Sequence, residues 1–137
     1  MNTRYLFRAK RIDNGEWVEG YYALIGKKHV IISKEPEGYY TESIEERHGY
    51  EIVNVDPSTI CQCTGLKRFF EKDIVKRTDV HEVGEPSIGI IEYDVENTAF
   101  VIHWIGEELY SPMYPWENKI KVIGNIFDNP ELLEQEG

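Results

Sequence analysis

The chain has 137 residues, of which 25 are Asp or Glu and 15 are Lys or Arg, so its formal net charge is −10. This length fits one domain whose core needs no disulfide bond, and no apolar run approaches the roughly 20 residues of a membrane helix. The negative charge disfavours general binding to phosphate backbones. The start of the chain lacks a signal-peptide core, which predicts a cytoplasmic protein.

The first residues predict a β-hairpin. Apolar and polar side chains alternate over residues 4–11, the period of a half-buried strand. The dipeptide Asn14-Gly15 supplies the positive φ angles that a tight hairpin turn requires. Residues 16–25 then form the returning strand.

The rest of the chain predicts further short strands separated by polar, glycine-containing or proline-containing turns. They are expected at residues 28–33, 50–55, 59–66, 72–80, 87–94, 97–104 and 119–127. Residues 34–49 are predicted to form a long polar loop with one helical turn at 41–47, and residues 106–118 a second loop. Such spacing indicates a mainly β domain of barrel or sandwich type. Within a single domain, the chain can be subdivided into an N-terminal sheet, residues 1–55, and a C-terminal barrel, residues 56–137.

The end of the chain predicts a short C-terminal helix. Asn129 is placed as its N-cap and Pro130 at its first position, where the missing N–H costs nothing. Glu131 then lies near the positive end of the helix. Leu132 and Leu133 form a small apolar face for docking.

Two segments together resemble the YopX family of phage and prophage proteins. Residues 58–76 share the family's Gln, Thr-Gly-Leu-Lys and Asp-Ile-Val positions, and residues 120–133 resemble the family's usual ending. The opening residues are also similar, with Trp17 and Gly20 in place. Cys61 and Cys63 depart from the family pattern, which commonly has Gly and an aromatic there, and Lys72 replaces the usual Gly.

The resemblance implies a mostly β, SH3-like or related small barrel that is encoded on mobile elements, with additional hairpins and long polar loops. It brings no established activity, cofactor or catalytic residue. The expected setting is therefore the cytoplasm of a bacterial host.

The sequence predicts no metal site and no enzyme. Cys61 and Cys63 are two residues apart, which is not zinc-ligand spacing, and both are expected to be reduced thiols. The segment from Asp94 resembles a calcium loop only superficially, because Ala99 stands where that loop needs glycine. No serine lies in a Gly-x-Ser-x-Gly motif. No cofactor is expected.

One candidate surface for protein contact lies in the segment 110–118. Its members are aromatic or flexible apolar side chains in a proline-stiffened stretch: Tyr110, Met113, Tyr114 and Trp116. Such residues are favoured at interface centres. The alternative is that they cap one end of the barrel. A strand edge, such as that of residues 120–127, could also pair with another subunit and give a homo-oligomer.

A second candidate surface is basic and would bind nucleic acid. Its cations are Arg4, Arg8, Lys10, Arg11, Lys27 and Lys28, with Tyr21 and Tyr22 near them. Small barrels bind single strands by stacking bases on aromatic rings beside such cations. The alternative is a solvated face that balances the acidic loop. The sequence therefore favours a non-catalytic phage accessory protein acting through protein contacts or self-association, with a nucleic-acid-associated module as the alternative.

Overall fold

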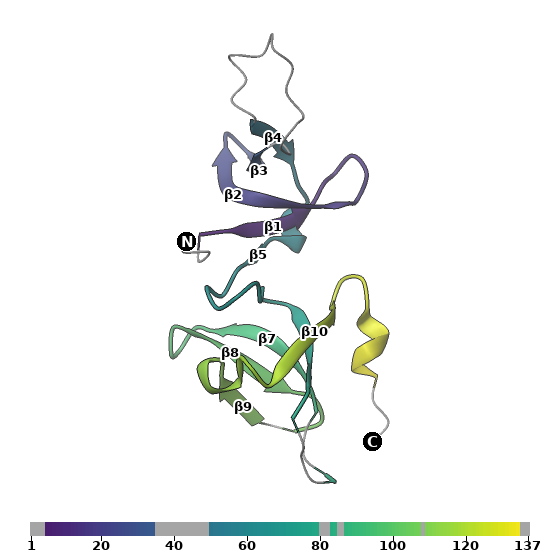
Figure 1. Cartoon of the computed structure of the whole chain (residues 1–137). Coiled ribbons are helices and arrows are strands. Elements are labelled where there is room, and N and C mark those ends of the chain that lie inside the picture. The colour runs from purple at the N-terminus through teal and green to yellow at the C-terminus, as the bar shows by residue number, and fades with distance from the viewer. Residues whose placement is uncertain (1–4, 35–49, 80–82, 85–86, 108, 135–137) are drawn as a thin grey trace. The chain divides into compact units, whose positions relative to one another are not determined.

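The computed structural model describes residues 5–34, 50–79, 83–84, 87–107 and 109–134 (Figure 1). These residues form two compact units, which we call the N-terminal unit, Tyr5–Gln62, and the C-terminal unit, which begins at Cys63. The sequence predicts a boundary after residue 55, whereas the N-terminal unit continues to Gln62. Each unit contains one five-stranded antiparallel sheet, so the predicted mainly β class is confirmed. The helical turn predicted at residues 41–47 lies outside the described residues.

The N-terminal sheet has the strand order β4-β3-β2-β1-β5. Its elements are β1 (Phe7–Lys10), β2 (Trp17–Ile25), β3 (Lys28–Lys34), β4 (Tyr50–Asn54), the 3-10 helix η1 (Pro57–Thr59) and β5 (Cys61–Gln62). The predicted first hairpin is confirmed, with Lys10 opposite Trp17 and a positive φ of 75° at Gly15.

One face of the N-terminal sheet carries its core. Ala9, Ile31, Val53 and Val55 are buried there. Partly buried hydrophobic side chains pack against them from β1, β2 and the segment before β5: Phe7, Val18, Tyr22 and Ile60. Alternate residues of a strand point to opposite faces, so the period-two pattern read from the sequence places these side chains together.

The turn before β5 is tied to β1 by polar groups. The Asp56 carboxylate accepts a hydrogen bond from the Ser58 backbone N–H at 3.0 Å, which caps η1. The Thr59 hydroxyl oxygen accepts one from the Lys10 backbone N–H at 2.8 Å. The Asp-Pro-Ser-Thr segment is therefore a short capped 3-10 turn.

The C-terminal sheet has the strand order β10-β6-β7-β8-β9. Its elements are β6 (Asp73–Arg77), β7 (Ile88–Asp94), β8 (Ala99–Trp104), β9 (Leu109–Pro112), the 3-10 helix η2 (Tyr114–Trp116), β10 (Ile120–Asn125) and the 3-10 helix η3 (Pro130–Leu133). The prediction of a loop over residues 106–118 was wrong in part, because β9 lies within it. Pro112 is tolerated as the last residue of β9, which is an edge strand.

The core of the C-terminal unit lies on one face of its sheet. Its buried members come from four strands, the segment before β6 and the residue before η2: Phe69, Val75, Ile91, Ile102, Trp104, Met113 and Ile120. Gly89 lies directly opposite Trp104 in the β7–β8 register. A Cβ atom at Gly89 would lie 2.6 Å from Cγ2 of Ile102, so a larger residue does not fit there without movement.

The predicted C-terminal helix is a 3-10 turn, and its predicted cap is absent. Asn129 stands at the N-cap position, but its side chain makes no cap hydrogen bond to η3. Its Oδ1 atom instead accepts a hydrogen bond from the Asn125 backbone N–H at 3.2 Å. The side chain is therefore used to fold the chain back onto the end of β10.

Candidate functional site

The turn after β10 is organised around the side chain of Asn125, which is only 9% exposed. Its Oδ1 atom accepts hydrogen bonds from the backbone N–H groups of Phe127 and Asp128, both at 2.9 Å. Its Nδ2 group donates to the Asp128 carboxylate at 3.2 Å. Gly124 is needed beside this turn, because a Cβ atom there would lie 2.5 Å from Oδ1 of Asn129.

Replacing Asn125 by alanine is expected to lower the free energy of unfolding by about 2 kcal/mol, since two backbone N–H groups lose their acceptor. Chemical denaturation of both variants measures the change. Asn118→Ala is the matched control, because Asn118 is exposed and its amide oxygen accepts a hydrogen bond from the exposed ammonium group of Lys67. Equal stability of the Asn125→Ala and Asn118→Ala proteins would contradict this role.

The segment between β5 and β6 forms a second turn held by polar groups. The Thr64 hydroxyl oxygen accepts a hydrogen bond from the Leu66 backbone N–H at 3.1 Å. The buried carboxylate of Asp73 accepts one from the Phe70 backbone N–H at 2.9 Å. Because Asp73 lies opposite Asn125 in the β6–β10 register, the two turns lie at the same end of paired strands.

The residues predicted for protein contact fall into two groups. Tyr110 is 51% exposed and Tyr114 is 76% exposed. Met113 is buried in the core, and Trp116 is half-buried with its ring edge-on to Trp104 at a centroid distance of 5.0 Å. Only the two tyrosines of this set therefore present most of a side chain to solvent, while the other two hold the segment onto the core.

The predicted basic residues do not form one cluster. The Arg8 guanidinium and the Lys10 ammonium group lie 4.8 and 5.4 Å from the ring centroid of Trp17. Lys28 lies opposite Ile25 in the β2–β3 register. Ile25 is eight residues along β2 from Trp17, which in an extended strand is a distance of about 26 Å.

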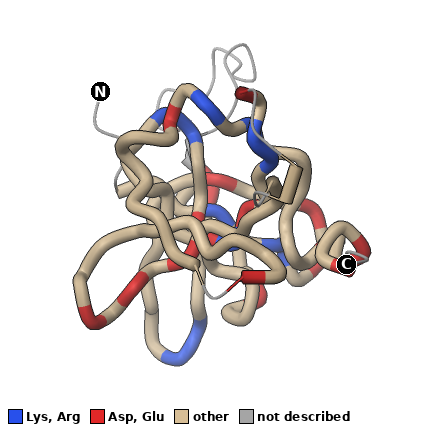
Figure 2. Tube along the Cα trace, turned by 90° about the horizontal axis from the view of Figure 1, so that it is seen from below, with Lys and Arg blue, Asp and Glu red and all other residues tan. Residues whose placement is uncertain are grey.

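Lys27 lies in the adjacent β2–β3 turn, and Arg4 lies outside the described residues. Along the trace, basic positions are interspersed with acidic ones (Figure 2). The structure thus separates the predicted set into a pair beside Trp17 and a pair at the far turn.

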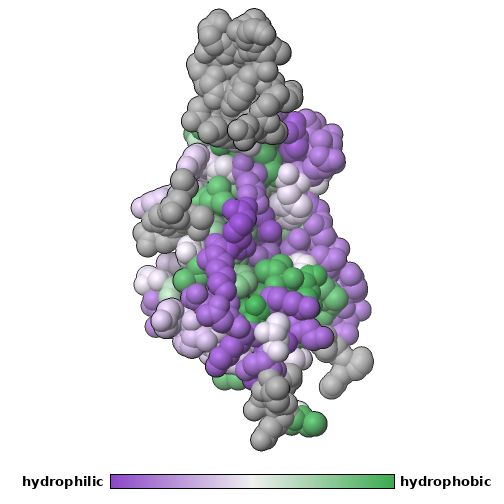
Figure 3. All heavy atoms as spheres, in the orientation of Figure 1, coloured by the Kyte–Doolittle hydropathy of each residue, from purple (hydrophilic) through white to green (hydrophobic). Residues whose placement is uncertain are grey.

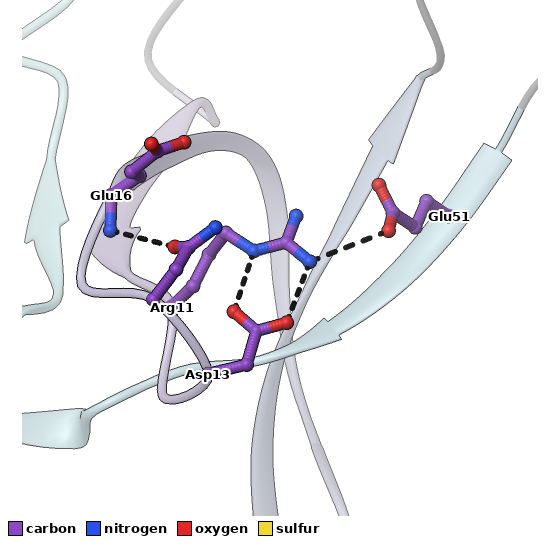
Figure 4. A network of polar contacts seen from close by, with 5 residues as sticks. Arg11, Asp13, Glu16 and Glu51 are labelled. Carbon is purple, nitrogen blue, oxygen red and sulfur yellow. Dashed lines mark hydrogen bonds and ion pairs between the residues drawn. The ribbon is translucent and has the colours of Figure 1, made fainter.

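Arg11 belongs to an ion-pair network instead (Figure 4). Its guanidinium donates two hydrogen bonds of 2.9 Å to the Asp13 carboxylate, and its Nη2 atom lies 3.7 Å from a carboxylate oxygen of Glu51. The hydrogen bonds from Arg11 lower the pKa of Asp13 from its ordinary value of 3.8. This network joins the hairpin loop to β4.

Arg11→Gln is expected to return the pKa of Asp13 toward 3.8. Because the folded pKa is depressed, this carboxylate stabilises the fold above pH 3.8, and the contribution is lost as pH falls through the folded pKa. The free energy of unfolding of the Arg11→Gln protein should therefore fall less than that of the unmodified protein as the pH drops below 3.8. Carboxyl NMR titration measures the shift. Asp79 is the control: its pKa is lowered by Arg77, so it should titrate as before.

A pocket of about 480 Å³ lies on the C-terminal unit. Its lining comes from β7, the β7–β8 turn, β8 and β9: Glu92, Tyr93, Asp94, Val95, Glu96, Val101 and Tyr110. Sequence reasoning missed it because residues 106–118 were predicted to be a loop, so Tyr110 had no strand partner. The available signal was the alternation of carboxylates at 92, 94 and 96.

Tyr110 of the pocket lining is held by His103, which lies opposite it on β8. The ring of His103 stacks on Tyr110 at a centroid distance of 4.4 Å and an interplanar angle of 14°. Nδ1 of His103 lies 3.1 Å from a carboxylate oxygen of Glu92. The chain Glu92–His103–Tyr110 therefore links β7, β8 and β9 across one face of the sheet.

Both cysteines are buried thiols, and Cys61 donates to the Thr59 carbonyl oxygen at 3.3 Å. Within the described residues, no group of three His, Cys, Asp or Glu side chains is placed to hold a metal ion. The same part of the chain contains no helix that is long and apolar enough to span a membrane.

The family model for the YopX protein matches residues 6–134, which is nearly the whole chain. A search of curated proteins found no match.

Proposed function

The chain belongs to the YopX family, and we propose that it is a non-catalytic phage or prophage accessory protein that acts in the host cytoplasm through protein contacts, with other proteins or with further copies of itself. The observation that carries this proposal is the exposure of apolar side chains on and after edge strand β9. Leu109, Tyr110 and Tyr114 are 45%, 51% and 76% exposed. We call these three residues at the β9 edge the β9 surface; Leu109 and Tyr110 are consecutive on the strand and so point to opposite faces of the sheet.

The β9 surface has the properties of a contact site. Tyrosine is enriched at interface centres, and side chains on ordered backbone lose little entropy on docking. The backbone here is held by Met113 in the core and by the hydrogen bond from the Trp116 N–H to the Met113 carbonyl at 2.9 Å. On the face of the molecule that Figure 3 shows, hydrophobic side chains reach the surface in patches bordered by hydrophilic ones.

The polar residues that resemble the family pattern serve the fold. Thr64, Asp73, Asn125 and Asn129 all bind backbone N–H groups within turns. This supports a family defined by its scaffold, with function in surface residues. As part of the same proposal, the SH3-like curvature that the sequence assigned to residues 56–137 is assigned instead to the N-terminal sheet. The support is the close approach of β2 to β3 at Gly20, where a Cβ atom would lie 2.2 Å from the Ile32 carbonyl oxygen.

A photo-crosslinking amino acid at position 110 or 114 tests the proposal. In lysate of induced or infected host cells we expect discrete adducts from these positions. Tyr21 is the matched control, because it is 57% exposed but lies on β2 of the other unit. An adduct of twice the 16.0 kDa chain mass would identify self-association. The same adduct pattern from position 21, or none from 110 and 114, would overturn the proposal.

The nucleic-acid alternative is supported by one observation, the placement of Arg8 and Lys10 beside Trp17 on one face of β1. We expect no mobility shift of single-stranded or double-stranded DNA or RNA at low salt, because the net charge is −10. A salt-sensitive complex that weakens with Arg8→Gln would instead favour the alternative.

A further inference from the structure

We infer that the β9 surface receives an extended basic segment of a partner protein, which pairs with the open edge of β9 and places a lysine or arginine side chain in the neighbouring pocket. This inference rests on the proposed function and adds the class of partner. Three independent features support it: the strand edge, the composition of the pocket wall and the position of the carboxylates.

The strand edge is available for pairing. β9 is the last strand of its sheet, and in the described part of the chain it pairs only with β8, from Leu109 opposite Trp104 to Pro112 opposite Val101. The outer edge of such a strand presents backbone N–H and C=O groups. An extended peptide can add to this edge as a further strand, with affinity from main-chain hydrogen bonds and specificity from side-chain pockets.

The register places the pocket beside that added strand. Glu92 lies opposite Val101 on β8, and Val101 lies opposite Pro112 on β9. Tyr110 is two residues from Pro112 and therefore lies on the same face of the sheet as Glu92. A peptide strand paired with β9 would direct every second side chain to this face, toward the Tyr110 wall of the pocket.

The pocket is suited to a cation. Glu92, Asp94 and Glu96 supply carboxylates, and Tyr110 supplies an aromatic ring. Carboxylates bind guanidinium and ammonium groups through charge-assisted hydrogen bonds, and tyrosine rings pack against their alkyl stems and attract their charge. The volume of about 480 Å³ is in the usual range for ligand pockets and admits a long side chain.

Two of the three carboxylates, those of Asp94 and Glu92, are already oriented by the protein. Asp94 accepts a hydrogen bond from the Glu96 backbone N–H at 3.1 Å and one from the Asn97 side-chain amide at 2.7 Å. Glu92 is held by His103. Preorganised groups cost less to order on binding, so the site gains affinity from them.

Charge selects a basic partner over a second copy of this chain. The pocket carries three carboxylates, and the chain as a whole has a net charge of −10. Two copies joined through this edge would bring their acidic pockets close together, which like-charge repulsion opposes. A basic segment gains attraction from the same field.

The test uses a fluorescein-labelled peptide of alternating lysine and valine, with binding followed by fluorescence anisotropy on the full chain. A peptide with glutamate in place of lysine is expected not to bind. A third peptide, N-methylated on alternate residues along one edge, keeps the charge but cannot form the main-chain ladder, and is expected to bind at least tenfold more weakly.

Protein variants locate the site. Glu96→Lys is expected to weaken binding of the lysine peptide about tenfold, whereas Glu16→Lys, an equal charge change at an exposed position of the other unit, should have little effect. Tyr110→Ala should likewise weaken binding while Tyr21→Ala does not. Equal weakening by Glu96→Lys and Glu16→Lys, or unchanged binding of the N-methylated peptide, would overturn the inference in favour of general charge attraction.

The two proposals can fail separately. If no lysine peptide binds but position 110 still yields discrete adducts, the basic-segment inference falls and the protein-contact proposal stands. If position 110 and position 114 yield no adducts and no peptide binds, both fall.

Discussion

Replacing Trp104 by alanine is expected to destabilise the C-terminal unit by about 3–5 kcal/mol, the usual cost of removing a large buried aromatic side chain. Trp104 is 1% exposed and lies in the core cluster. Its ring meets Trp116 edge-on, and its indole N–H donates to the Ser111 hydroxyl oxygen at 2.9 Å. The substitution would leave a cavity and an unmatched hydroxyl on β9.

Hydrogen exchange read by mass spectrometry measures this effect, because it reports protection separately for the segments of each unit. Protection should be lost first in the strands that surround Trp104, β7, β8 and β9. Ser111→Ala is the graded control: it removes one hydrogen bond without a cavity and should cost about 1 kcal/mol. A Trp104→Ala protein no less stable than Ser111→Ala would show that this core is not assembled around the indole.

Replacing Gly20 by alanine is expected to destabilise the N-terminal unit by about 3 kcal/mol through overpacking. Gly20 is buried in β2, opposite Phe7 of β1. The added Cβ atom would lie 2.2 Å from the carbonyl oxygen of Ile32 and 2.9 Å from Cγ2 of Ile31. The nearest obstacle is backbone, which cannot rotate away as a side chain can, so β2 and β3 must separate.

Gly26→Ala is the matched control for this prediction. Gly26 has a φ of +63°, but no atom lies within 4 Å of its added Cβ, so only backbone strain of about 1–2 kcal/mol is expected. Urea denaturation and hydrogen exchange in β2 and β3 compare the two proteins. If Gly20→Ala were as stable as Gly26→Ala, the close approach of the two strands would be refuted.

The β9 surface shows how far sequence reasoning reached for the candidate site. Aromatic residues in a proline-containing stretch drew attention to Tyr110 and Tyr114, whose side chains are exposed. The same composition could not separate them from Met113 and Trp116, because side-chain direction depends on where β9 ends and η2 begins. Predicting a loop there hid the strand edge and, with it, the pocket.

The amino-acid sequence by itself determined the mainly β class, the first hairpin and the positions of most strands, because alternation of apolar and polar residues and turn-forming residues act over a few neighbouring positions. It also determined the family, through two segments whose polar residues hold turns. Only the tertiary structure decided which strands share a sheet, which strand lies at an edge, and that Asn129 turns back to Asn125 rather than capping a helix. The first two features depend on contacts between residues distant in the chain, whose free energies no local pattern records. The third is a choice between two nearby partners for one side chain, which the order of residues does not distinguish.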